Sequence, residues 1–182
     1  MNSELADCFH AFELLEADRV RVLAQLAEWP QECISFRPTP NAWSAPEVLD
    51  HIVRSETGIT GRMRRGLESP HIFAGEDRSK VETLYQALRS NQSFQVPAGA
   101  ATAHPDPQTT LSEVTSRWQQ SRMELRSFLE SLTAADLGYG LFCHPFAGWM
   151  TCGEVLEHFS THLYHHEFQL ARLRVACSPP AV

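Results

Sequence analysis

Four of the nine histidines of this chain lie within nine residues near its C-terminal end: His158, His162, His165 and His166. On a helix, residues four apart stack on adjacent turns of one face. His162 and His166 have this spacing and fall on or at the margin of the apolar face of the segment, whereas His158 and His165 project further round. Such a pair is how a helix offers two imidazoles to one metal ion.

Two imidazoles do not complete a metal site, so a third ligand has to come from another element. The best candidate is His51, which ends the stretch SAPEVLDH; a similar stretch, TCGEVLEH, ends at His158. Each stretch begins with Ser or Thr followed three residues later by Glu, the capping box that starts a helix. His51 therefore lies about two turns into its helix, at the edge of an apolar stripe. Three neutral imidazoles with open positions would suit one divalent transition metal, Zn²⁺, Ni²⁺ or Fe²⁺.

Two alternatives stay open from the residues alone. Histidines at the edge of a core also serve as hydrogen-bonded packing residues, and a solvated histidine cluster needs no metal. The spacing HxxxH also occurs twice, as His158–His162 and His162–His166. If the last helix were rotated, His158 would replace His166, and the two similar stretches would then supply matching ligands.

The segments that carry these histidines have the periodicity of helices. Residues 3–29 lack Gly and Pro and have apolar residues three and four apart, which predicts a long first helix. A second helix should run from about Ala45 into the sequence RMRRGLE. A third is predicted over residues 109–132, and the last should start at Thr151 and continue without Pro as far as Ser178.

A long connection, about residues 69–108, separates the second and third helices. It holds a predicted short helix at DRSKVETLYQALRS and then a segment rich in Pro, Gly and Ala. The stretch GLFCHPFAGW, before the last helix, is the one β-like candidate in the sequence and is interpreted as an irregular turn. Four long helices with one long crossover predict an all-α fold, a four-helix bundle whose second and third helices are joined by the crossover.

Composition narrows the class of protein. The 182 residues, 43% hydrophobic and 20% charged, fit one globular domain that spans residues 1–182. The formal net charge of −7 argues against nucleic acid or an anionic membrane surface as the partner. No apolar run approaches the ~20 residues that span a bilayer. A small molecule is therefore the expected partner.

Cysteine usage and the N-terminal residues indicate the compartment. The N-terminal stretch is acidic and has no apolar core, unlike a secretory signal, so a cytoplasmic protein is expected. The five cysteines are odd in number and form no CxxC pair, so they are expected to be reduced thiols. Cys143 and Cys152 have no sequence-local activator and are not expected to be catalytic. Glu16 and Arg19 interrupt the apolar stripe of the first helix and could line a cleft, although a solvated face is the simpler interpretation.

The sequence resembles the DinB-like superfamily of four-helix proteins. The motifs that carry the resemblance are WSAPEVLDHIV with His51, the turn HPFAGW, and GEVLEHFSTHLYHHEFQL. They cover nearly the whole chain in the expected order. In that family one histidine from the second helix and an HxxxH pair from the fourth bind a divalent metal, and by position these are His51, His162 and His166. The resemblance thus implies the same three ligands as the helix-face argument.

Characterised relatives in this superfamily include transferases and an isomerase that use low-molecular-weight thiols. The resemblance therefore implies a metal-dependent thiol transferase or, with metal-activated water, a hydrolase of small substrates. A non-catalytic metal-binding or stress-related bundle is the alternative. No Asp or Glu stands in a general-base register such as HExxH, since Glu157 and Glu167 point away from the inner face. No catalytic residue and no further cofactor are assigned, and family habit and the many apolar residues suggest a homodimer.

Overall fold

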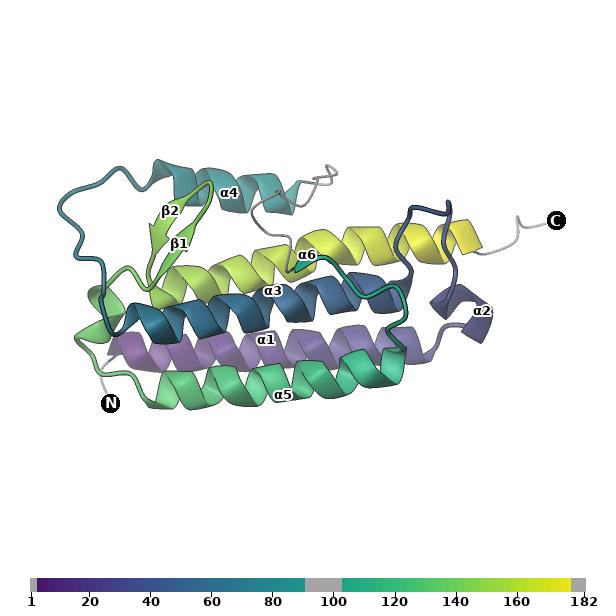
Figure 1. Ribbon diagram of the computed structural model, residues 1–182, viewed down its shortest axis with the longest axis horizontal. Helices are drawn as coiled ribbons and strands as arrows, with labels where there is room; N and C mark the ends of the chain where they lie inside the picture. The colour runs from purple at the N-terminus through teal and green to yellow at the C-terminus, as the bar shows by residue number, and fades with distance from the viewer. Residues whose placement is uncertain (1–2, 91–102, 178–182) are drawn as a thin grey trace.

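The computed structural model describes residues 3–90 and 103–177 and is mostly helical (69%). Its four long helices are α1 (Ser3–Ala27), α3 (Ala45–Gly66), α5 (Leu111–Glu130) and α6 (Cys152–Cys177). They lie side by side along the long axis of the molecule (Figure 1). Helices α3 and α1 each pack on both α5 and α6. The prediction of an all-α four-helix bundle is confirmed.

The connection between α3 and α5 is long, as predicted, and its first half holds α4 (Ser79–Arg89). This helix packs on α6 from outside the bundle (Figure 1). The predicted Pro/Gly/Ala-rich segment falls mostly within residues 91–102, outside the described residues. A one-turn helix, α2 (Gln31–Ile34), follows α1, and a 3₁₀ turn, η2 (Asp136–Gly138), follows α5.

Both predicted capping boxes start their helices. At α3, the backbone N–H and the hydroxyl of Ser44 donate to the carboxylate of Glu47 at 2.8 and 2.7 Å. At α6, the backbone N–H of Thr151 donates to Glu154 at 2.7 Å, and the Glu154 N–H donates back to the Thr151 hydroxyl at 3.3 Å. These local contacts satisfy amides that the first helical turn leaves without partners. They therefore determine how many turns separate each helix start from its histidines.

The segment before α6 is not the irregular turn that the sequence predicted. Strands β1 (Phe142–His144) and β2 (Gly148–Met150) form an antiparallel hairpin in which His144 lies opposite Gly148. Gly148 has a φ of +76°, which a residue without Cβ adopts readily, so the chain reverses there. Each strand has only three residues, too few for an alternating pattern to stand out in the sequence.

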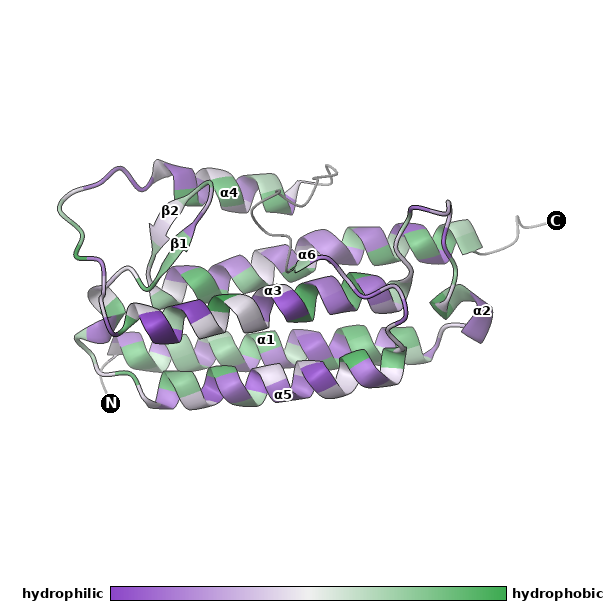
Figure 2. Ribbon diagram, in the orientation of Figure 1, coloured by the Kyte–Doolittle hydropathy of each residue, from purple (hydrophilic) through white to green (hydrophobic). Residues whose placement is uncertain are grey.

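Two apolar clusters fill the bundle. The apolar stripe on α3, at whose edge His51 is expected, is buried, and α5 buries a stripe of its own; the buried members are Val48, Ile52, Ile59, Met63, Val114, Trp118, Leu125 and Leu129. Figure 2 shows hydrophobic and hydrophilic residues alternating along each long helix, as amphipathic helices require. Hydrophobic burial on this scale stabilises the bundle without help from a ligand.

A buried ion pair links α3 to α5 inside the bundle. Arg122 Nη2 and Trp118 Nε1 each donate to a different carboxylate oxygen of Glu56 at 2.9 Å. Glu16 lies 3.4 Å from Arg122 Nε and accepts two hydrogen bonds from Arg19. Glu16 and Arg19 therefore extend this ion pair; both are half-buried and not on a fully solvated face, and neither lines the two cavities described below.

The prediction that all cysteines are reduced thiols is also wrong, because Cys33 and Cys177 form a disulfide. The two residues are 144 positions apart and meet because α2 packs against α6. Cysteine spacing alone cannot reveal such a pair. The other three cysteines are free thiols, with Cys8 and Cys152 buried and Cys143 exposed. No helix in the described ranges has the length and apolar character needed to cross a membrane.

Candidate metal centre

Three imidazoles from two helices converge at one point between α3 and α6. The Nε2 atom of His162 lies 3.2 Å from Nε2 of His51 and 3.1 Å from Nε2 of His166. One ring nitrogen from each residue can be chosen so that all three lie within 4.8 Å of one another. His51 and His166 are buried and His162 is half-buried. The three histidines selected from the sequence are thus brought together in a group that could hold a metal ion.

Hydrogen bonds on the outer side of the group determine the tautomers of two rings. His51 Nδ1 lies 2.7 Å from the carbonyl oxygen of Ala103, and His166 Nδ1 lies 2.9 Å from Oε1 of Gln169. An oxygen of this kind only accepts hydrogen bonds, so each Nδ1 carries the hydrogen. In a neutral imidazole the Nε2 atom then has a free lone pair, as a metal ligand requires.

The donor set fits a divalent transition metal. The Nε2 lone pairs of His51 and His166 are both directed at Nε2 of His162, which has at most one hydrogen to donate. His162 can therefore donate to only one of the two neighbours, and in the other contact two nitrogen lone pairs face each other. A cation between the nitrogens would remove this repulsion. Nitrogens bound to one ion at about 2.1 Å are roughly 3.0 to 3.4 Å apart, close to the observed 3.1 and 3.2 Å. Neutral imidazoles suit Zn²⁺, Ni²⁺ or Fe²⁺.

Burial keeps these imidazoles neutral. Loss of solvation, reinforced by the neighbouring His51, lowers the pKa of His166 to about 3. Loss of solvation, reinforced by the neighbouring His166 and His51, lowers the pKa of His162 well below its ordinary value. Burial also lowers the pKa of His51, although its hydrogen bond to Ala103 acts in the opposite direction. Metal binding at neutral pH would therefore displace few protons.

The group lies in the wall of a cavity of about 1160 Å³. Its lining comes from α3, α4, α6, the β1–β2 hairpin, the loop before α3 and residues 103–104 before α5. The ring of Trp43 lies against that of His51, with centroids 5.1 Å apart. No Asp or Glu is among the lining residues that the structure describes. The three imidazoles thus face a cavity that is large enough for a small molecule.

This constellation occurs in a chain that matches a known family over most of its length. The family model of the DinB superfamily matches residues 14–170. The chain belongs to the DinB superfamily. Neither the curated proteins nor the solved structures include a match to it. Membership agrees with the helical bundle and with the resemblance drawn from the motifs around His51, His162 and His166.

The two remaining histidines of the cluster in this DinB-superfamily chain lie beside the group. His158 does not replace His166: its ring stacks on that of His162, with centroids 5.6 Å apart and planes 18° apart. Within the described part of the chain, the buried His158 Nδ1 has no hydrogen-bond partner. His165 lies toward the end of α4, where it hydrogen-bonds to the backbone of residues 88 and 90. Both line the cavity.

Sequence reasoning missed two histidines that line the cavity, His104, which precedes α5, and His144 on β1. The ring centroid of His144 lies 5.3 Å from that of His158, so His144 extends the row of imidazoles toward the hairpin. The turn HPFAGW, which begins at His144, is one of the motifs shared with the family. The motif HPFAGW could have pointed to His144. The selection of site residues was based on helix faces, and His144 lies in a hairpin.

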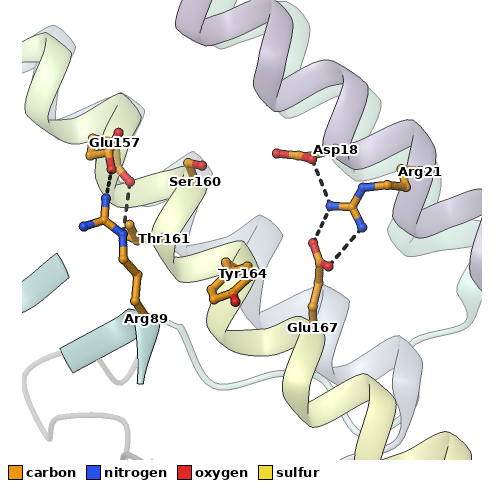
Figure 3. Close-up of a pocket in the computed structure, with 8 residues that line it drawn as sticks. All are labelled: Asp18, Arg21, Arg89, Glu157, Ser160, Thr161, Tyr164 and Glu167. Atoms are coloured by element: carbon orange, nitrogen blue, oxygen red, sulfur yellow. Dashed lines mark hydrogen bonds and ion pairs between the residues drawn. The ribbon is translucent and has the colours of Figure 1, made fainter. Parts of the chain in front are cut away.

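A second, smaller cavity of about 340 Å³ lies among α1, α4 and α6. Figure 3 shows its charged side chains paired with one another: Arg21 with Asp18 and Glu167, and Arg89 with Glu157. Glu157 and Glu167 line this cavity and not the histidine cavity, in agreement with the prediction that they point away. No ligand is needed to neutralise these charges.

Proposed function

We propose that this DinB-superfamily protein is a metal-dependent enzyme that transfers a low-molecular-weight thiol to an electrophilic small molecule. One divalent transition metal, Zn²⁺, Ni²⁺ or Fe²⁺, would be held by His51, His162 and His166. The observation that carries the proposal is the convergence of three Nε2 atoms in the wall of a cavity of about 1160 Å³. When bound, such an ion with open positions binds a thiol and stabilises it as the thiolate near neutral pH.

The chain's own residues prepare the site for an anionic ligand. The Ala103 carbonyl and the Gln169 side chain hold His51 and His166 in the tautomer that leaves Nε2 free. All three ligands are neutral, and the described lining contains no carboxylate. Positive charge at the site is therefore not compensated by the protein, and this favours a thiolate over a neutral thiol.

The cavity lining favours thiol transfer over hydrolysis. Metal-assisted hydrolysis often uses a carboxylate as the general base that activates water, and none lines this cavity among the described residues. The free cysteines Cys8, Cys143 and Cys152 do not line it either. The sulfur nucleophile would therefore come from a co-substrate. A cavity of about 1160 Å³ has room for this second molecule, because one drug-sized ligand fills roughly 300–1,000 Å³.

The test starts from protein purified without a metal-affinity tag. Elemental analysis should find about one divalent transition metal per chain. Loaded protein should then conjugate glutathione or cysteine to 1-chloro-2,4-dinitrobenzene faster than buffer alone, and a chelator should remove the difference. The His51→Ala variant should lack both metal and activity, whereas His10→Ala, at an exposed site on α1, should keep both. A conjugation rate that chelation leaves unchanged would refute the proposal.

Two further expectations accompany this proposal. The protein is proposed to act as a homodimer, and a single monomeric species in sedimentation velocity at micromolar concentration would contradict this. The cytoplasmic location also stays a prediction. The Cys33–Cys177 disulfide removes the support that the cysteine pattern lent to it, because disulfides are rare in reducing compartments.

A further inference from the structure

The charged side chains that line the histidine cavity, among the described residues, are all positive. The chain has a formal net charge of −7, yet the described residues lining the cavity include three arginines and no Asp or Glu. The arginines are Arg54, Arg62 and Arg172. Because like charges cluster here against the sign of the whole molecule, the cavity favours anionic ligands.

One of these arginines is available to a ligand. Arg54 is paired, since its Nε donates to Asp50 at 2.7 Å. Arg62 has no hydrogen bond or ion pair within the described ranges of the chain; its guanidinium carbon lies 5.5 Å from the centroid of the Phe142 ring. A guanidinium beside an aromatic ring keeps its N–H groups free for a planar anion such as a carboxylate.

A second hydrogen-bond donor, His144, lines the same cavity as Arg62. His144 Nδ1 accepts hydrogen bonds from the backbone N–H groups of Phe146 and Ala147, both at 3.2 Å. In the neutral imidazole, Nε2 therefore carries the hydrogen and can donate it. Burial lowers the pKa of His144, and the positive charge of Arg62 lowers it further. Phe142 links the two side chains, because its ring centroid lies 5.5 Å from the guanidinium carbon of Arg62 and 6.1 Å from the ring centroid of His144.

The two donors lie at the hairpin end of the cavity, away from the metal ligands. The ring of His144 contacts that of His158, which in turn stacks on His162. Apolar side chains, among them those of Ile59 and Phe142, line the same cavity. A ligand that reached from the donors to the metal centre would therefore need an apolar body.

We propose that Arg62 and His144 form a carboxylate subsite for the electrophilic substrate. The substrate would be a largely apolar carboxylate whose opposite end is directed to the metal centre. This inference rests on the proposed thiol transfer and names the substrate class for it. Arg62 would donate two parallel hydrogen bonds to the carboxylate and His144 Nε2 a third. A single guanidinium beside a neutral imidazole balances one negative charge, which favours a carboxylate over a dianionic phosphate.

The test compares octanoate with 1-octanol by isothermal titration calorimetry, on metal-loaded protein and on protein stripped by a chelator. Octanoate should bind at least tenfold more tightly than octanol in both forms. The variants Arg62→Gln and His144→Gln should each weaken octanoate binding about tenfold and leave octanol binding unchanged. The matched control is Arg65→Gln, because Arg65 is an exposed arginine on the same helix and does not line the cavity. This variant should bind octanoate and octanol as the wild type does.

Comparing the metal-loaded and metal-free forms with the variants distinguishes failure of the subsite from failure of the metal centre. Octanoate binding that needs the metal and ignores Arg62→Gln would show the carboxylate on the ion; it would overturn the subsite and support the metal centre. Equal affinities for octanoate and octanol would also overturn the subsite. Binding that persists without metal and is lost in Arg62→Gln supports the subsite, whatever becomes of the thiol-transfer activity. Circular dichroism of each variant checks that loss of binding is not loss of fold.

Discussion

The Nε2 atom of His51 on α3 lies 3.2 Å from the Nε2 atom of His162 on α6, although the residues are 111 positions apart. This contact brings α3 and α6 together at the candidate metal centre and suggests which substitutions should remove metal binding. Replacing His51, His162 or His166 by Ala should lower metal affinity at least a hundredfold, because each removes one of three ligands. Competition with a chromophoric chelator measures the affinity. The fold should survive, since apolar packing supplies most of its stability.

The neighbouring histidines provide the controls for these variants. His158→Ala and His165→Ala should change metal affinity far less, because neither residue belongs to the convergent group. Loss of metal binding in His158→Ala, together with its retention in His166→Ala, would show that the two similar stretches of sequence supply matching ligands after all.

Gln169 should matter for metal affinity without touching the ion. Its Oε1 accepts the hydrogen of His166 Nδ1 at 2.9 Å and so holds the ligating tautomer. Gln169→Ala should weaken metal binding about 10- to 100-fold, as expected for groups that orient a ligand. Gln120→Ala, at an exposed site on α5, is the control in the same titration. Equal affinities for the two variants would argue against the tautomer assignment.

Metal-free protein should lose stability in acid through its buried histidines. Burial lowers the pKa of His158 to about 3, so between about pH 6 and 4 the unfolded chain binds a proton there that the folded chain does not. This contribution to stability is present above the unfolded pKa and is lost as the pH falls toward the folded value. The free energy of unfolding should fall by about 1.4 kcal/mol per pH unit for this residue.

Urea unfolding with a chelator at pH 6, 5 and 4 measures that slope. His158→Gln should have a shallower slope than the wild type by about this amount, because glutamine does not titrate. His10→Gln, at an exposed position, should leave the slope unchanged. A His158→Gln slope equal to that of the wild type would mean that His158 is protonated equally in both states.

The Cys33–Cys177 disulfide should stabilise the bundle substantially, because it closes a loop across 144 positions of the chain. Cross-links of this kind typically contribute about 2–4 kcal/mol by restricting the unfolded chain. Cys33→Ser and treatment with dithiothreitol should lower the melting temperature by the same amount and not add to each other. Cys143→Ser, at an exposed free thiol, should have little effect. Additive effects would show that the reductant acts elsewhere.

The buried Glu56–Arg122 pair should tolerate joint replacement better than the loss of one partner. Arg122→Met leaves a desolvated carboxylate without its cation and should cost about 3–5 kcal/mol of unfolding free energy. Adding Glu56→Gln should recover much of this, since the amide oxygen can still accept from Trp118 Nε1. Chemical denaturation of the single and double variants measures both values. A double variant no more stable than Arg122→Met would contradict this.

Several features of the site could be predicted because they depend on local geometry. The capping boxes Ser44–Glu47 and Thr151–Glu154 form within one helical turn, so the starts of α3 and α6 follow from a few adjacent residues. His166 and His162 are neighbours on a helix by virtue of their spacing alone. The partner of His166, Gln169, is also a short step along the same helix and could have been found by the same argument.

Other features depend on which residues of distant segments meet, and spacing carries no information about that. The carbonyl of Ala103 that orients His51 is a backbone group, which any residue could supply. Cys33 and Cys177 pair because α2 packs against α6, and the short β1–β2 hairpin offers too few residues for a recognisable period. The sequence was therefore misread at the disulfide and at the hairpin.

The sequence by itself determined the four amphipathic helices, their starting points and the inward pair His162 and His166, because these follow from hydrogen bonding and periodicity within a few turns. Only the tertiary structure decided the rotation of α6 against α3, which brings His51 to His166 and leaves His158 to one side. It also brought His144 and Arg62 to the lining of the same cavity. The physical reason is that helix rotation and hairpin placement minimise the exposed apolar area of the whole bundle, a sum over all contacts that no single segment encodes.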